Sequence, residues 1–504
     1  MAWSGIAWKE STEIYDLRFT IYDCRRDAET QRTRRIAEWS PNFWTAVAQR
    51  SGDTAFRASA PLRKRRGASL PAAVQISASL CVLCVSAFIG LFPLRADAEA
   101  SLLTGATVHT VSGATITNGQ VLIVDGKISA VGETVSAPDA KQIDLHGLHL
   151  YPGMIALNTD LGLVEIDAVR STVDVREVGE YTPDVYSWHA VNPDSELLPV
   201  ARANGVSHFE PVPLGAVVAG QSGLIAINGW TTEQMVAKKS IALHVFWPSA
   251  NLDMTPKEKS RDQAKWKSLE DQAKERAEKL RQLDDFFAEA RAYAKAKDST
   301  KDFQIVPAWE AMLPVVRGEI PVMIHADEVR QIRAAVSWAT TNGVKMILAD
   351  AMDSWRVADL LATNKIPVIF SHVFTQPLRG EDSFDAHFRA ASVLTKAGVK
   401  VAFSGGDASL VKNLPYAAAQ AAAFGLSADE ALKGITLYPA QIAGVADRLG
   451  SIETGKDATL FVADGDILDV RSNVKRMWIG GKEVSLENRH TRLYEKYRSR
   501  PKQN

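Results

Sequence analysis

The chain has 504 residues, of which 46% are hydrophobic and 23% are charged, and its formal net charge is −1. This composition is typical of a globular protein and excludes wholesale disorder. The near-zero charge argues against a nucleic-acid-binding protein, which would normally carry a basic domain. All three cysteines lie in the first 84 residues, and none belongs to a zinc-finger pattern.

The first 98 residues contain a candidate export segment. Residues 63–66 are basic, residues 67–94 carry no charge, and Ala96 and Ala98 form an A-x-A pattern. These three features predict a signal peptide over 63–98 and a secreted or periplasmic mature chain. The alternative is that residues 67–94 remain in the inner membrane as an anchor. Residues 1–62 stay unassigned, and translation starting near Leu62 would give a conventional signal.

Both ends of the mature chain have the pattern of short β-strands. Residues 99–153 alternate apolar and polar side chains between turns such as Asp125-Gly126. Residues 446–486 repeat this style, with Gly480-Gly481 as a turn. We therefore predict a small β-sandwich built from both ends, followed by a C-terminal tail over 487–504.

The middle of the chain, residues 154–445, alternates short apolar runs with amphipathic helices. This rhythm predicts an α/β fold with a parallel sheet, and its length fits a (β/α)8 TIM-like barrel. A doubly wound open sheet is the alternative, but no GxGxxG motif follows any strand. Residues 256–298 begin at a Thr255-Pro256 start signal and predict one long helix with a solvated charged face.

Active groups of a barrel sit at the C-terminal ends of its strands. The polar residues at these ends are Asn158, Asp160, His244, His325, Asp327, Asp350, His372 and Asp407. Imidazoles and carboxylates suit zinc, iron or manganese, which would generate hydroxide from water near neutral pH. A carboxylate such as Asp407 would accept the proton of that water. The alternative is that each histidine is a structural residue.

Four motifs resemble the amidohydrolase superfamily, in its secreted imidazolonepropionase-like branch. They are the opening TGATVHTVSGATITNGQVLIVDGKISAVG, then HLYPGMIALNTDLGL, then GVKVAFSGGDAS, and finally FGLSADEALKGITLYPAQIAGVADRLGSIETGKDATLFVADGD. The resemblance extends from about Leu102 to Leu486. It implies a barrel with an attached sandwich and hydrolysis of carbon–nitrogen bonds other than standard peptide bonds.

The resemblance also implies a degenerate metal site. Asn158 and Asp160 replace the two histidines of the family's HxH motif, and Asp350 replaces the histidine of the sixth strand. His325 matches the fifth-strand histidine, and Asp407 matches the eighth-strand aspartate. No lysine ends the run IALHVFW, so a two-metal site bridged by a carbamylated lysine is unsupported. The remaining set implies at most one divalent metal (zinc, manganese or iron), or none.

The sequence therefore predicts a secreted hydrolase in which activated water attacks a carbon–nitrogen bond, with Asp407 and His325 as catalytic residues. The expected metal ligands are His325, Asp407, Asp160 and Asp350, and the expected substrate contacts are Asn158, His372, His244 and Gln221. The alternative is a non-catalytic pseudoenzyme that binds a ligand or partners an active paralogue. Expected partners are a small-molecule substrate and a second copy or paralogue, with no nucleic acid. Membrane contact is expected only through residues 67–94, if they are uncleaved.

Overall fold

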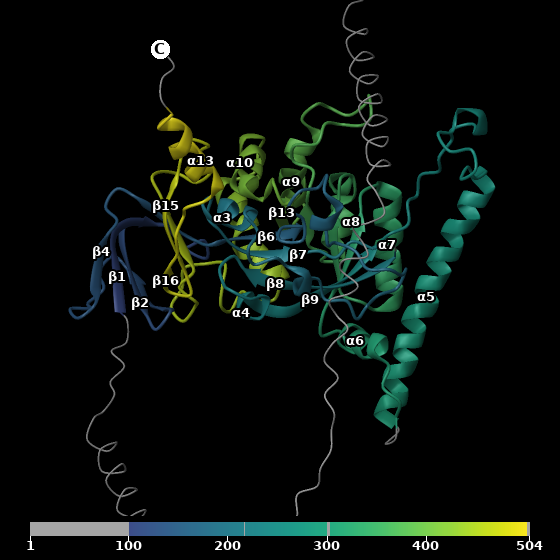
Figure 1. Ribbon diagram of the computed structural model, residues 1–504, viewed down its shortest axis with the longest axis horizontal. Helices are drawn as coiled ribbons and strands as arrows, with labels where there is room; N and C mark the ends of the chain where they lie inside the picture. The colour runs from purple at the N-terminus through teal and green to yellow at the C-terminus, as the bar shows by residue number, and fades with distance from the viewer. Residues whose placement is uncertain (1–99, 216, 300–302, 501–504) are drawn as a thin grey trace, which may run out of the picture. The chain divides into compact units, whose positions relative to one another are not determined.

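The computed structural model describes residues 100–215, 217–299 and 303–500 (Figure 1). These residues form a closed eight-stranded barrel and a separate eight-stranded sheet. The expected signal segment, the residues before it and the three cysteines lie outside the described residues. Among the described helices, none is long and apolar enough to cross a membrane.

The separate sheet joins the two ends of the described chain, as the sequence predicts. Its N-terminal strands are β1 (Ala100–Val108), β2 (Ile116–Val124), β3 (Lys127–Gly132), β4 (Lys141–Asp144) and β5 (His149–Pro152). Its C-terminal strands are β14 (Leu460–Ala463), β15 (Val474–Ile479) and β16 (Lys482–Glu483). Strand β14 lies between β5 and β15 and pairs with both in the antiparallel direction. The two chain ends therefore share one hydrogen-bonded sheet.

Two hairpin turns of this sheet pack backbone against backbone. Gly126, in the β2–β3 turn, has φ +79°, and a Cβ there would lie 2.7 Å from the Gly480 carbonyl oxygen. Gly481, in the β15–β16 turn, has φ +78°, and a Cβ there would lie 2.5 Å from the Cα of Gly126. Both positions need glycine because of the left-handed backbone and because no side chain fits between the turns.

The barrel strands account for most of the buried apolar runs of the middle region. They are β6 (Met154–Thr159), β7 (Val206–Pro211), β8 (Val218–Ala226), β9 (Val236–Phe246), β10 (Val322–Ala326), β11 (Met346–Asp350), β12 (Val368–Phe370) and β13 (Val401–Gly406). Pairing of β13 with β6 closes the barrel. Odd-numbered residues such as Ile155, Met323 and Ile347 fill its interior, whereas Val322 and Leu348 pack against the helices. This alternation follows the two-residue period of a strand.

One strand departs from the predicted all-parallel arrangement. Strand β8 pairs antiparallel with both β7 and β9. Only residues 212–217 connect β7 to β8, and a parallel crossover needs a dozen residues or more. The chain therefore turns back as a hairpin, and the barrel does not consist of eight equal βα units.

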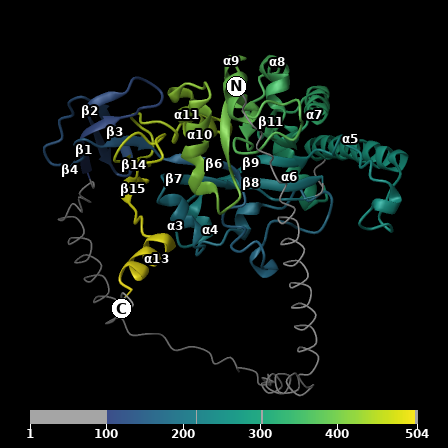
Figure 2. The same ribbon diagram turned by 90° about the horizontal axis from the view of Figure 1, so that it is seen from above.

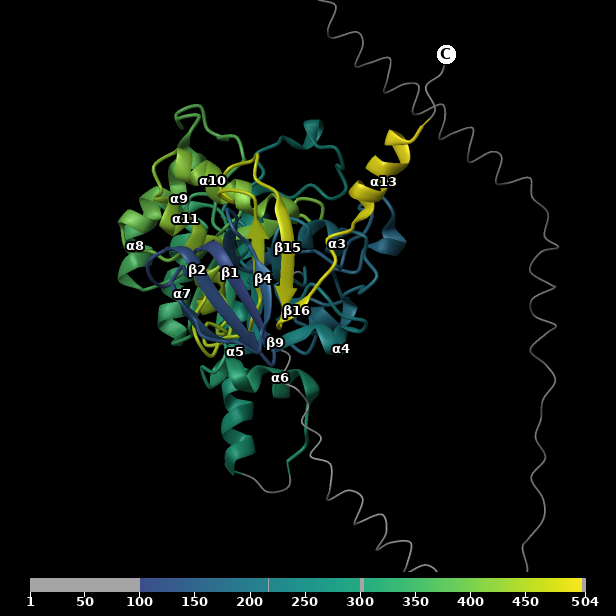
Figure 3. The ribbon, with the colours of Figure 1, turned by 90° about the vertical axis from the view of Figure 1, so that its left-hand side faces the viewer.

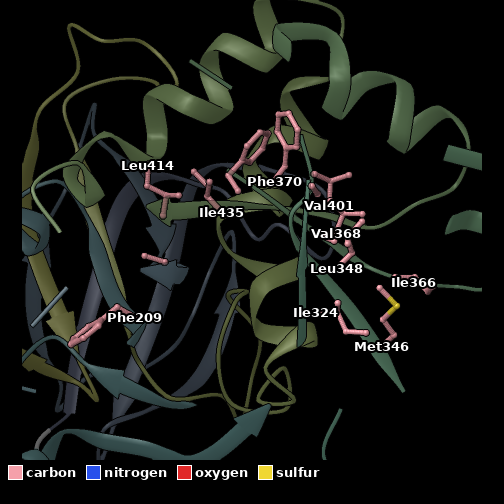
Figure 4. Close-up of a cluster of buried hydrophobic side chains, with 14 of the residues drawn as sticks. Phe209, Ile324, Met346, Leu348, Ile366, Val368, Phe370, Val401, Leu414 and Ile435 are labelled. Carbon is pink, nitrogen blue, oxygen red and sulfur yellow. The ribbon is translucent and has the colours of Figure 1, made fainter. Parts of the chain in front are cut away.

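Helices surround the barrel and bury its outer surface (Figure 2). They are α3 (Leu197–Arg202), α4 (Thr232–Met235), α6 (Pro307–Val316), α7 (Val329–Asn342), α8 (Ala358–Thr363), α9 (Ala386–Lys396), α10 (Leu414–Ala423), α11 (Ala428–Ile435) and α12 (Leu437–Ile442). Figure 4 shows the apolar layer between strands and helices, which includes Phe209, Leu348, Phe370 and Ile435. This packing fixes the strand ends, which carry the polar groups described below.

Two segments differ from their predicted limits. The long helix α5 (Leu269–Ser299) begins at Leu269 rather than at Pro256, because Ser268 caps it by accepting the Asp271 N–H. Before it, the Trp266 indole donates to the Thr255 carbonyl and folds the preceding segment back. The predicted tail contains a helix, α13 (Arg489–Arg498), whose Arg492 pairs with Glu196 at 2.6 Å beside α3 (Figure 3).

Candidate functional site

Three left-handed residues mark the C-terminal mouth of the barrel. Asn158 is the next-to-last residue of β6 and has φ +52°, while Asp350 and Ala351 follow one another at the end of β11 with φ +66° and +64°. Residues other than glycine seldom adopt this conformation, although asparagine and aspartate tolerate it best. Such strain persists where the surrounding structure enforces it and is concentrated at functional sites.

The unusual backbone turns Asn158 and Asp350 toward each other. Regular alternation would direct both side chains outward, because Leu157 and Ala349 already face the barrel interior. Instead the Asn158 amide nitrogen donates to Asp350 Oδ1 at 2.8 Å and to Ser371 Oγ at 3.2 Å. Strands β6 and β11 are not neighbours in the barrel, so this hydrogen bond crosses its mouth.

Asp350 is the best-supported carboxylate of the mouth. Besides Asn158, it contacts the His325 imidazole, with Asp350 Oδ2 2.9 Å from His325 Nδ1. Burial raises the pKa of Asp350, but His325 and Asn158 lower it more, so the pKa lies well below its ordinary value. The Asp350 side chain remains 31% exposed, against 4% for His325. The ionised carboxylate of Asp350 is therefore partly exposed to solvent, and it contacts the buried imidazole of His325.

A second imidazole lies behind the first. His244 Nδ1 is 3.0 Å from His325 Nε2, and the Phe246 ring stacks on His325 with 4.1 Å between ring centres. Burial lowers the pKa of His244. Beyond His244 lies Glu210, whose Oε1 is 3.5 Å from His244 Nε2. The four side chains form one row from the mouth into the barrel.

Glu210 was not among the predicted site residues. It is the next-to-last residue of β7 and is fully buried, where Oε1 accepts from Ser222 Oγ at 2.6 Å and Oε2 accepts from the Asn158 N–H at 3.0 Å. Burial raises the pKa of Glu210, but His244, Ser222 and the Asn158 N–H lower it more. Glu210 thus stabilises the left-handed backbone of Asn158 by accepting its N–H. The sequence could have predicted Glu210 from its position near the end of an apolar strand.

Asp160 and Asp407 lie at the mouth with different surroundings. Asp160 Oδ1 accepts from the Ala408 N–H at 2.5 Å, and burial together with nearby Asp407 raises the pKa of Asp160. Asp407 is exposed, and its Oδ1 accepts from the backbone N–H of Ser409 at 2.8 Å and its hydroxyl at 2.6 Å. These are the contacts of a turn residue. The structure brings His325 together with Asp350, and it pairs Asp407 with Ser409.

His372 forms a separate pair beside this row. Its Nε2 lies 2.9 Å from Asp327 Oδ1, and its Nδ1 lies 3.1 Å from Thr375 Oγ1. Both side chains of the His372–Asp327 pair are partly exposed. His372 therefore remains accessible at the mouth, as a substrate contact would require.

Two predicted substrate contacts are enclosed in the protein. Gln221 lies in β8, where its amide donates to the carbonyl oxygens of Pro183 and Ala311 and accepts from the Ser240 hydroxyl. His244 is likewise fully buried. In this structure Gln221 joins the barrel wall to neighbouring segments, and His244 supports His325, so contact of either side chain with substrate stays a prediction.

The donor set at the mouth does not fit a resident metal ion. A metal shared by the two imidazoles would lie between His244 Nδ1 and His325 Nε2. Asp350 and Glu210 face the opposite ring nitrogens, so neither carboxylate reaches that point. Catalytic zinc usually has three protein ligands. Within residues 100–215, 217–299 and 303–500, no group of three or more histidine, cysteine, aspartate or glutamate side chains is placed to hold a metal.

A closed barrel with polar side chains converging at its C-terminal mouth is the architecture of a barrel enzyme. The model of the family described as "Amidohydrolase family" matches residues 233–484, half of the chain. The chain therefore belongs to the amidohydrolase family.

Individual proteins agree with this assignment. An imidazolonepropionase of Mesorhizobium japonicum is 24% identical over 69% of this chain and 87% of its own length. One of Brucella suis is 25% identical over 29% of this chain and 36% of its own length, so only part of that relative is matched. The crystal structure of an amidohydrolase from Thermotoga maritima has a TM-score of 0.67 at 27% identity, covering 76% of this chain and 99% of that one.

Proposed function

We propose that the chain is an exported hydrolase that cleaves a carbon–nitrogen bond other than a standard peptide bond, by attack of water at the barrel mouth. The observation that carries the proposal is the contact of Asn158, Asp350 and His325 across the mouth. Strained backbone and an ionised, accessible carboxylate occur together there, which is typical of an active site. Family membership supports the choice of reaction, although a fold alone does not establish it.

In the proposed reaction, Asp350 binds and orients the attacking water. Its two oxygens are fixed by Asn158 and His325, which leaves lone pairs free to accept from water. A low pKa makes Asp350 a poor proton acceptor, so proton transfer is assigned to Asp160, two residues beyond Asn158. Burial raises the pKa of Asp160, which suits a group that takes up and returns a proton.

The bonds and protons balance as follows. The water oxygen bonds to the carbonyl carbon, and one water proton passes to Asp160. The carbon–nitrogen bond then breaks, and Asp160 returns that proton to the leaving nitrogen. The products are an acid and an amine. His372, accessible beside the mouth, is proposed to contact the substrate.

Three matched variants test the assignment: Asp350→Asn, Asp160→Asn and Asp407→Asn. The assay measures the appearance of a free amine from N-acyl amino acids and lactams. We expect Asp160→Asn to lose at least a hundredfold in kcat, as is typical when a general base is removed. Asp350→Asn should lose a comparable factor because the attacking water is no longer oriented, while Asp407→Asn stays active. Loss of turnover in Asp407→Asn alone would return the proton-transfer role to Asp407. A folded wild-type chain that releases no amine would favour the pseudoenzyme.

A further inference from the structure

The imidazole pair occupies the part of the barrel where the family resemblance places a metal. We propose that this centre is metal-free: His244 and His325 form a direct hydrogen-bonded chain that ends on Asp350, with His244 as a positioning residue. The metal-free state stands on the geometry alone, whereas the catalytic effect of His244 rests on the proposed function.

A direct chain needs one donor at each of its two contacts. Two neutral imidazoles carry one N–H each. If both N–H groups lie on Nδ1, His325 donates to Asp350 at 2.9 Å and His244 donates to His325 at 3.0 Å. The remaining lone pair, on His244 Nε2, then faces Glu210 at 3.5 Å, the longest contact of the row. The opposite arrangement would place a lone pair against Asp350 at the shortest contact.

A metal between the rings would require a different pattern. Both facing nitrogens would then be metal ligands, and each ring would donate its other N–H to a partner, as ligating histidines almost always do. His325 has this partner in Asp350, but buried His244 Nε2 has no hydrogen-bond partner. Glu210 Oε1 is instead satisfied by Ser222 at 2.6 Å. The direct imidazole chain accounts for the contacts at 2.9 and 3.0 Å without a metal, whereas in the metal-bound pattern the second N–H of His244 would have no partner within hydrogen-bond distance.

The chain also explains how Asp350 stays in place on a left-handed residue. Asn158 and His325 hold its two oxygens from opposite sides, and His244 fixes the ring plane of His325 from behind. If His325 accepts at Nε2, the hydrogen of its neutral ring lies on Nδ1, toward Asp350. His244 thereby selects the His325 tautomer that supports the carboxylate.

Elemental analysis of the full-length protein is the first test. The chain is purified without chelator, incubated with excess zinc or manganese, and desalted. We expect the desalted protein to retain no stoichiometric metal whose binding requires His325. Stoichiometric metal that disappears in His325→Gln, but remains in the buried control His208→Gln, would overturn the proposal. Metal that both variants retain would lie elsewhere and leave this centre metal-free.

Two substitutions of His244 give a readout that a merely structural role would not. Asparagine can place an amide N–H where His244 Nδ1 lies, but that nitrogen cannot bind a metal. Leucine has no donor. We expect His244→Asn to keep kcat near the wild-type value and His244→Leu to lose about tenfold in kcat with little change in KM, the effect of one hydrogen bond. Equal loss in both variants would overturn the positioning role.

A spectroscopic measurement covers the case in which these variants fail to fold. Imidazole N–H protons in strong hydrogen bonds give low-field proton resonances. In wild-type protein we expect these resonances to be unaffected by EDTA or added zinc, and the melting temperature to be unchanged by zinc. Loss of the resonances on zinc addition, with a rise in melting temperature, would overturn the metal-free centre. Because these readouts need no substrate, they remain valid if the proposed hydrolysis is not found.

Discussion

The buried imidazole of His208 makes the stability of the protein depend on pH. His208 lies in β7, and its Nδ1 is 3.0 Å from Ser207 Oγ. Burial, together with the charge of Arg448, lowers the pKa of His208 from 6.5 to about 4. The unfolded chain therefore takes up a proton between these two values that the folded chain does not. The stabilising effect is complete above pH 6.5 and is lost as the pH falls toward 4.

The size of this effect follows from the two pKa values. Each unit of pKa difference is worth about 1.4 kcal/mol. Between pH 7.5 and pH 4.5, His208 should therefore lower the free energy of unfolding by about 2.5 kcal/mol. Other titrating groups add their own dependence, so the quantity to measure is a difference between variants.

The assay is urea denaturation of wild type, His208→Gln and His146→Gln at both pH values. Glutamine keeps a hydrogen-bonding amide beside Ser207 but does not titrate. Between pH 7.5 and pH 4.5, we expect the free energy of unfolding of His208→Gln to fall by about 2.5 kcal/mol less than that of wild type. The exposed residue His146 is the matched control, and His146→Gln should behave as wild type. If His208→Gln loses as much stability as wild type, His208 is not the group responsible and the reasoning fails.

Three further substitutions test one packing contact, one buried ion pair and one hydrogen-bonded anchor elsewhere in the described chain. Gly434→Ala should destabilise the protein by about 1–3 kcal/mol, because its Cβ would lie 2.8 Å from the Phe403 ring; Gly380→Ala, which meets nothing within 4 Å, is the control in thermal denaturation. Arg379→Met should cost about 2 kcal/mol, because both 2.7 Å bonds to buried Asp353 disappear; Arg389→Met, at a 3.6 Å surface pair, should cost little, and equal losses in urea denaturation would contradict this. Tyr293→Phe removes hydrogen bonds to Glu310 at 2.6 Å and to the Val306 N–H at 3.2 Å. Limited proteolysis should then cut near Val306 faster than in wild type, and an unchanged rate would show that these bonds do not anchor the segment.

The sequence predicts the barrel because its strands are buried on both faces and appear as short apolar runs. It also predicts the shared sheet, since the strands at both chain ends alternate in the same way. The reversal of β8 is missed, although the six residues between β7 and β8 are too few for a crossover helix. The start of α5 is also misplaced, because Pro256 begins only a 3-10 turn (Lys257–Lys259) and the cap is Ser268.

The strand-end rule places Asn158, His325 and Asp350 at one mouth, but it does not predict their contacts. Alternation along β6 and β11 points Asn158 and Asp350 away from each other, and only the positive φ values reverse this. For Asp407, the preceding Gly406 has φ +61°, and the aspartate side chain is directed into its own turn. Backbone reversals of this kind depend on tertiary contacts, such as Glu210 with the Asn158 N–H, which no local pattern encodes.

The sheet shared by the two chain ends has a consequence for biogenesis. Leu460 of β14 pairs with Pro152 of β5, so the sheet cannot be completed until nearly the whole chain has been synthesised. Until then the edge of β5 offers unpaired backbone groups to other chains, which is a risk for aggregation. A chain truncated before β14 should therefore accumulate in inclusion bodies.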